Sequence, residues 1–146
     1  MSISRKALCI FYGFVGLVAL VGTWSNNLQY ASLGFVGANI RFWQETLTNP
    51  ASRSITVDVF FLSLAAITWM LLEARRLQMR GAWLYVMFGL FTAISFTFPV
   101  FLINRERALS RLDSSLPGGH LTIADILGLA GLAAVFVAYA GVALVR

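Results

Sequence analysis

Four long apolar stretches dominate the sequence, and each is close to the length that crosses a lipid bilayer. They run over residues 7–24, 50–74, 82–103 and 121–145. A helix of about 20 residues spans the roughly 30 Å hydrocarbon layer. Charged residues make up only 12% of the chain, which is about half the share found in soluble domains. We therefore expect an all-α integral membrane bundle of four transmembrane helices, forming one domain over residues 1–146.

The ends of these stretches carry recognisable helix signals. Asn49 followed by Pro50 is typical of a helix start, with an N-cap and then proline in the first turn. Thr122 and Asp125 resemble a capping box that opens the last helix. The first stretch has the basic start of a signal peptide, but no Ala-x-Ala signal follows Val21, so we expect it to be retained.

The segment between the first two apolar stretches has a helical pattern of its own. At 100° per residue, Phe35, Phe42 and Leu47 fall on one side of a helix, and Arg41 and Glu45 fall opposite at ion-pair spacing. Such a segment is typical of an amphipathic helix that lies in the membrane interface. The sequence therefore predicts an interfacial helix over about residues 35–47, on the outer side.

The distribution of charge predicts the orientation. With the N-terminus in the cytoplasm, four spans give the inner side a net charge of +5 and the outer side none. The basic residues alone divide six to five in the same direction. We therefore expect a multi-pass protein with both the N-terminus and the C-terminus in the cytoplasm.

The composition argues against several classes of site. The chain has one cysteine, Cys9, and one histidine, His120, so a cysteine or histidine metal cluster is not expected. No cofactor and no catalytic residue is predicted, although a bound lipid is compatible with the composition. The basic residues lie at the edges of apolar stretches, which favours membrane lipids as partners over nucleic acid. Other membrane subunits or self-association are further expected partners.

Several short motifs occur in a recognisable order. They are Asn49-Pro50-Ala51-Ser52, Asp58, Glu73-Ala74-Arg75-Arg76, Pro99-Val100-Phe101-Leu102 and Arg105-Glu106. In order and spacing, this pattern over about residues 30–108 resembles a family of small bacterial integral membrane proteins catalogued as a domain of unknown function. The resemblance implies a location in the bacterial cytoplasmic (inner) membrane, and it implies no activity.

Asp58 is the most informative polar residue, because an ionisable group inside a span costs about 2.5–3.5 kcal/mol on insertion scales. We expect it to pair with Arg105 at the outer end of the third span. Glu106, Arg53 and Asp125 complete the candidate polar site or structural ion pair. The pattern fits both a ligand pocket and a pair that fixes the second helix to the third.

A second group of charges is expected at the inner face. Glu73 follows Asp58 by fifteen residues, or about 22 Å of helix, so the two carboxylates are too far apart to act together. We expect Glu73, Arg75, Arg76 and Arg80 to form an interfacial salt-bridge cluster. Asp125 also has a simpler role open to it, as the cap of the last helix.

Three functions remain open at this point. The first is a small non-enzymatic membrane protein, either an accessory subunit of a membrane complex or a lipid-binding bundle. The second is a membrane enzyme acting on a lipid or isoprenoid, with Asp58 as the acid and Arg105 orienting a polar head. The third is a small oligomeric transporter, against which stands the absence of charge between Ala7 and Trp24.

Overall fold

A computed structural model describes residues 3–112 and 122–145 of the chain. The described residues form an all-α fold, as expected. The elements in chain order are α1 (Ile3–Asn27), the 3-10 helix η1 (Leu28–Leu33), α2 (Gly34–Glu45), α3 (Pro50–Arg76), α4 (Ala82–Phe91), α5 (Ile94–Leu112) and α6 (Ile123–Val145). Two helical stretches are long and apolar enough to cross a membrane. They are Ile3–Glu45, which includes α1, and α3. Two more, α4 and the Ile123–Ala138 part of α6, are apolar but shorter.

Helices α1 and α5 form the central antiparallel pair. Gly16 of α1 lies so close to α5 that an added Cβ would meet the Pro99 Cβ at 3.3 Å. One turn nearer the N-terminus, Gly13 faces Ile103 in the same way, at 4.0 Å. The glycines therefore let the two backbones approach, which is the usual way in which apolar helices pack without a large side chain between them.

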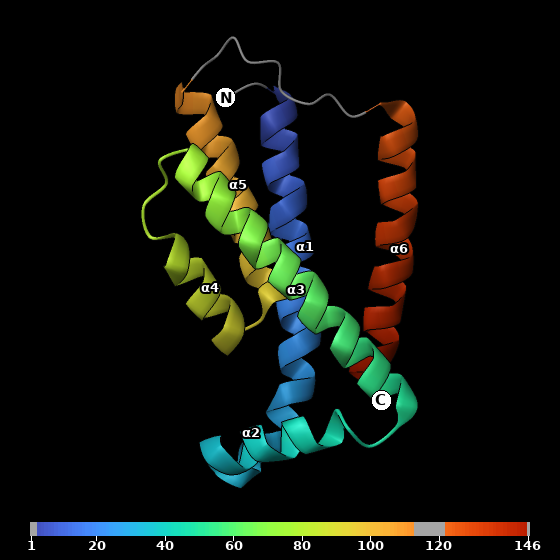
Figure 1. The fold of residues 1–146 in the computed structure, drawn as a ribbon. Coiled ribbons are helices and arrows are strands. Elements are labelled where there is room, and N and C mark those ends of the chain that lie inside the picture. Colours follow the sequence, from blue (N-terminus) through green and yellow to red (C-terminus); the bar gives the residue numbers. More distant parts are fainter. Residues whose placement is uncertain (1–2, 113–121, 146) are drawn as a thin grey trace.

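The expected span over residues 82–103 is wrong, because the chain breaks at Thr92–Ala93 and turns back. Helices α4 and α5 form an antiparallel hairpin (Figure 1) in which Tyr85 and Phe101 stack at 5.5 Å between ring centroids. At the turn, Trp24 Nε1 donates to Thr92 O at 3.1 Å. Ala93 O accepts from Phe96 N and Thr97 N, and also from Thr97 Oγ1 at 3.1 Å. Backbone polar groups in apolar surroundings need such partners.

This hairpin changes the path of the chain. The end of α5 lies beside the start of α1 and the end of α3, so α6 starts from that same end of the molecule and finishes at the other (Figure 1). The start of α1 and the end of α6 therefore lie at opposite ends of the fold, whereas the sequence predicted both termini on one side of a membrane. The expected topology required a third full-length helix between α3 and α6, and the α4–α5 hairpin starts and finishes at one end instead.

The remaining sequence expectations about local structure are confirmed. Asn49 Oδ1 accepts a hydrogen bond from Ser52 N at 2.9 Å and caps α3. Asp125 accepts from Thr122 N at 2.8 Å, and Thr122 Oγ1 accepts in return from Asp125 N. Helix α2 lies crosswise to α1 (Figure 1) and carries the Arg41–Glu45 ion pair at 2.7 Å.

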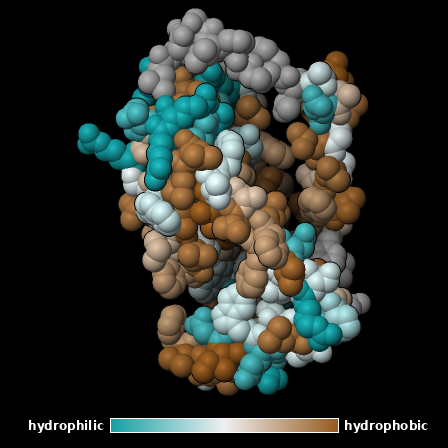
Figure 2. Space-filling model, in the orientation of Figure 1, coloured by the Kyte–Doolittle hydropathy of each residue, from teal (hydrophilic) through white to brown (hydrophobic). Residues whose placement is uncertain are grey.

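Packing is concentrated at one end of the fold. The buried core there consists of Met70, Ala74 and Phe101, from α3 and α5, with Tyr85 of α4 against it. Figure 2 shows hydrophilic side chains gathered at that end and at the α2 end, with hydrophobic surface on the flank between them. The first half of α3 is exposed almost all round.

Candidate functional site

The most developed polar arrangement lies around Glu73, near the end of α3. Its two carboxylate oxygens accept hydrogen bonds from different residues. Arg76 donates from Nε to Oε2 and from NH2 to Oε1, both at 2.7 Å, and Arg105 Nε donates to Oε1 at 2.7 Å. The Glu73 side chain is 8% exposed, so these donors replace the water that burial removes.

Arg105 connects this carboxylate to a second one. Its NH1 lies 2.7 Å from Glu106 Oε1, and the Glu106 side chain is also 8% exposed. The guanidinium carbon stands 5.6 Å from the centre of the Trp69 ring, a cation–π distance. A neighbouring pair, Asn104 Nδ2 and Tyr85 OH at 2.9 Å, joins α5 to α4. The result is a network that fixes α3, α4 and α5 to one another.

Three of the motifs that suggested the family resemblance therefore meet in space. The Glu73-Ala74-Arg75-Arg76 motif ends α3, and the Phe101 and Arg105-Glu106 motifs lie on α5. Phe101 is fully buried against Met70 and Ala74, one layer below the ion pairs. The apolar layer sets the distance between the helices, and that distance brings the charged groups into contact.

The expected inner and outer groups of charges are not separate. Glu73 and Arg76 pair as expected, whereas Arg75 and Arg80 are exposed. Arg105 and Glu106, assigned to the outer face, lie with Glu73 instead. The physical reason is again the hairpin, because α5 returns to the end at which α3 finishes.

The expected Asp58–Arg105 pair is wrong. Arg105 bonds to Glu73, which follows Asp58 by fifteen residues of the same straight helix, or about 22 Å. Asp58 itself is exposed on α3, and no described residue pairs with it. Of its other expected neighbours, Arg53 donates to Leu47 O at 2.9 Å and Asp125 caps α6. His120 lies outside the described residues.

The chemistry open to the Glu73 network is limited. Both carboxylates accept hydrogen bonds from arginines, so their oxygens are already engaged as acceptors. Within residues 3–112 and 122–145, no three His, Cys, Asp or Glu side chains gather in a way that could hold a metal ion. Arg5, in the first turn of α1, is buried at the same end of the molecule.

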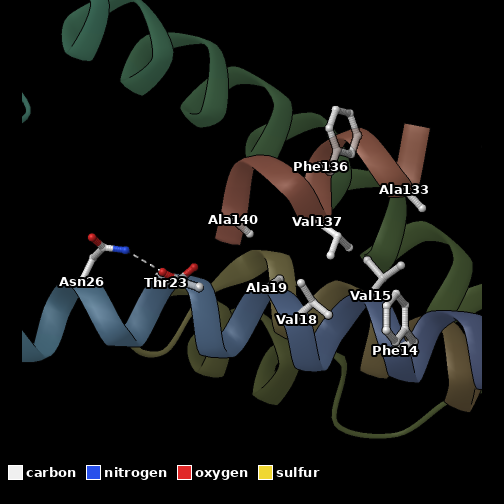
Figure 3. Close-up of a pocket in the computed structure, with 11 residues that line it drawn as sticks. Phe14, Val15, Val18, Ala19, Thr23, Asn26, Ala133, Phe136, Val137 and Ala140 are labelled. Carbon is white, nitrogen blue, oxygen red and sulfur yellow. Dashed lines mark hydrogen bonds between the residues drawn. The ribbon is translucent and has the colours of Figure 1, made fainter. Parts of the chain in front are cut away.

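A second feature, an apolar groove between α1 and α6, was not anticipated. It has a volume of about 560 Å³ and is lined on the α1 side by Phe14, Val15, Val18 and Ala19 and on the α6 side by Ala133, Phe136, Val137 and Ala140. Figure 3 shows Val15 and Val18 of α1 pointing toward Val137 of α6, with Thr23 and Asn26 toward one end. No sequence signal marked it, because the lining residues look like any apolar helix face.

The groove narrows where the two helices touch. An added Cβ at Gly22 would meet the Ala140 Cβ at 3.9 Å. At this polar end, Asn26 Nδ2 donates to Gly22 O at 2.8 Å and Ser25 Oγ donates to the same carbonyl at 3.2 Å. The groove is therefore apolar along its length and carries uncharged polar groups only at one mouth.

Comparison with known proteins gives a family and no function. No curated protein and no solved structure matches the chain. One family model, described as a protein of unknown function, DUF2834, matches residues 11–107. That range includes both halves of the Glu73–Arg105 network and excludes α6. The chain therefore belongs to the DUF2834 family, whose matched region is the part of the fold that the α1–α5 pair and the Glu73 network hold together.

Proposed function

We propose that this chain is a small non-enzymatic protein of the bacterial inner membrane that binds a lipid chain in the groove between α1 and α6. The observation that carries the proposal is the groove itself. Its volume of about 560 Å³ falls in the range of ligand pockets in proteins. Its apolar walls suit a hydrocarbon chain, and Thr23 and Asn26 at one mouth suit the ester or hydroxyl groups near a lipid headgroup.

Charge supports a definite orientation for this proposal. Eight basic residues lie at the end where α1 starts and where α3 and α5 finish: Arg5, Lys6, Arg75, Arg76, Arg80, Arg105, Arg107 and Arg111. Among the described residues, only Arg41 and Arg53 are basic at the α2 end. Basic residues favour the cytoplasmic side. We place the start of α1 in the cytoplasm, α2 in the outer interface and the end of α6 outside.

The other two functions receive less support. An enzyme with Asp58 as acid and Arg105 as its partner would need the two side chains together. Arg105 of α5 instead bonds to Glu73, which is fifteen residues, or about 22 Å, along α3 from Asp58. A transporter would need a polar path, and the groove is lined by apolar residues apart from Thr23 and Asn26. Both functions are therefore alternatives that the following experiments also test.

Native mass spectrometry of the chain released from mild detergent tests the lipid proposal. We expect one lipid to remain bound in a substantial fraction of the molecules. Val18→Trp, which fills the groove, should reduce that fraction several-fold. The matched control is Leu17→Trp, one residue away but 59% exposed and outside the groove. The proposal fails if both variants retain lipid equally, or if neither they nor the parent chain retains any.

Cysteine labelling in intact cells tests the orientation. The background is Cys9→Ala, which leaves no cysteine in the chain. A cysteine at Thr48 should react with a membrane-impermeant maleimide, whereas cysteines at Arg80 and Arg111 should react only after lysis. Labelling at Thr48 and Arg111 alike would mean that α5 ends outside, which would restore the third crossing and remove the re-entrant hairpin.

A further inference from the structure

Between residues 54 and 72, the outward face of α3 carries one charge, Asp58, on a mostly apolar surface. Partly or fully buried residues of this helix recur at Thr56, Ser63, Ile67, Met70 and Ala74 and mark its inward side. At 100° per residue, Asp58 lies about 180° from Ile67. Its neighbours along the outward side are Ile55, Phe61 and Leu62, which are 62%, 70% and 66% exposed.

This position is costly if the chain is in a membrane. Asp58 lies eight residues into α3, or about 12 Å along the helix, where a carboxylate faces hydrocarbon. Its side chain has a single methylene and cannot reach the interface as a long lysine or arginine does. No described residue pairs with it. The carboxylate therefore needs a cation that residues 3–112 and 122–145 do not supply.

We propose that this face of α3 docks against a transmembrane helix of another membrane protein, and that a lysine or arginine of that helix pairs with Asp58. Charge complementarity carries the assignment, because an acid on an apolar helix is stabilised most strongly by a base at the same depth. The flanking Phe61 and Leu62 supply an apolar contact on both sides of the pair. The proposal rests on the membrane location proposed above but not on the lipid groove.

A second copy of this chain is a poorer partner. In a symmetric pair with the two α3 helices in contact, Asp58 would meet its own copy, which brings like charges together. The two basic residues that the structure describes at that end are also engaged: Arg41 pairs with Glu45, and Arg53 bonds to Leu47 O. A self-pair would have to break one of these contacts, whereas a foreign helix would not.

Site-specific photocrosslinking in native membranes tests the proposal. A photoreactive amino acid replaces Leu62, which lies about 40° from Asp58 around the helix, or Leu64, which lies about 120° away. The two positions are matched, since both are leucines that are 66% and 60% exposed. We expect one discrete protein adduct from position 62 and none from position 64. The adduct should map to an apolar helix with a lysine or arginine within one turn of the crosslink.

Charge variants then identify the cause of the contact. Asp58→Asn should lower the adduct yield about tenfold or more, and Asp58→Glu should retain most of it. Exchanging the charges, Asp58→Lys with the partner's base changed to Asp, should restore it. The proposal would be overturned by an adduct to lipid or to the chain itself, or by the absence of any adduct. It would also be overturned if Asp58→Asn left the adduct yield unchanged. Val18→Trp should leave the adduct unchanged, which separates this result from the lipid test.

Discussion

The two halves of α3 are built from similar residues but have opposite surroundings. From Met70 to Arg76 the helix packs on α4 and α5, with Met70 and Ala74 buried and Glu73 held by two arginines. From Pro50 to Thr68 it has almost no neighbours, and its apolar side chains are exposed. Both halves carry one acid, Glu73 or Asp58. Only Glu73 finds its counter-charges within the described chain.

This contrast shows which contacts hold the chain together by itself. The second half of α3 contributes to a core with internal charge balance, as expected of a structural unit. The first half exposes large apolar side chains, among them Ile55, Phe61 and Leu62. Such a surface suits contact with lipid or with another protein. The predictions below test this difference, from the largest expected effect to the smallest.

The largest effect should come from the Glu73 network. Arg105→Gln leaves Glu73 and Glu106 without a shared counter-charge, and breaking a buried pair typically costs about 3–5 kcal/mol in the free energy of unfolding. Asp58→Asn in the isolated chain should cost nothing. Equilibrium unfolding in mixed micelles measures both. The double variant Glu73→Gln, Arg105→Gln should lose less free energy of unfolding than the sum of the losses in the two single variants. A comparable loss from Asp58→Asn would contradict the contrast.

The apolar layer below the network should come next. Phe101 is fully buried, so Phe101→Ala should lower the free energy of unfolding by about 3 kcal/mol. Phe61→Ala, on the exposed half of α3, should change it by less than about 0.5 kcal/mol. The same unfolding assay compares them. If both substitutions lower the free energy of unfolding by the same amount, the exposed half of α3 is packed in the isolated chain after all.

A smaller effect is expected where α3 begins. Asn49→Ala removes the acceptor for Ser52 N and should cost about 1 kcal/mol. The matched control is Asn39→Ala, because the Asn39 amide only donates to a carbonyl within α2 and alanine suits a helix interior. Amide exchange in residues 50–54 is the local readout. Faster exchange in both variants would show that the cap is not the cause.

The smallest effect concerns acidification at the α2 end. The hydrogen bond from the Tyr30 hydroxyl holds the pKa of Glu45 below its ordinary value, and the Arg41 guanidinium adds to this. The contact therefore stabilises α2 above the ordinary glutamate pKa, and this stability is lost as the pH falls through the lowered value. Trp43 fluorescence, taken as the difference from Trp43→Phe, should change in that acid range. Glu45→Gln should abolish the change.

Local features were predictable because their causes are local. The caps at Asn49 and at Thr122–Asp125, the helix over Gly34–Glu45 and the Arg41–Glu45 pair involve residues at most four positions apart. The partner of Arg105 was not predictable in this way. Choosing between Asp58 and Glu73 as its partner requires knowing whether residues 82–103 form one long helix or a hairpin. The hydropathy of these residues is the same in both arrangements.

The sequence by itself determined the apolar helices, their caps and the family of the chain, because periodicity, composition and motif order are written along it. Only the tertiary structure decided that the chain turns back at Thr92–Ala93. Apolar length cannot specify a break in a helix. At the break, Trp24, 68 residues earlier, donates to Thr92 O, whereas Ala93 O accepts from Phe96 N and Thr97 N in the first turn of α5. A carbonyl in apolar surroundings is costly without a donor, and the donor to Thr92 O lies on another helix, α1.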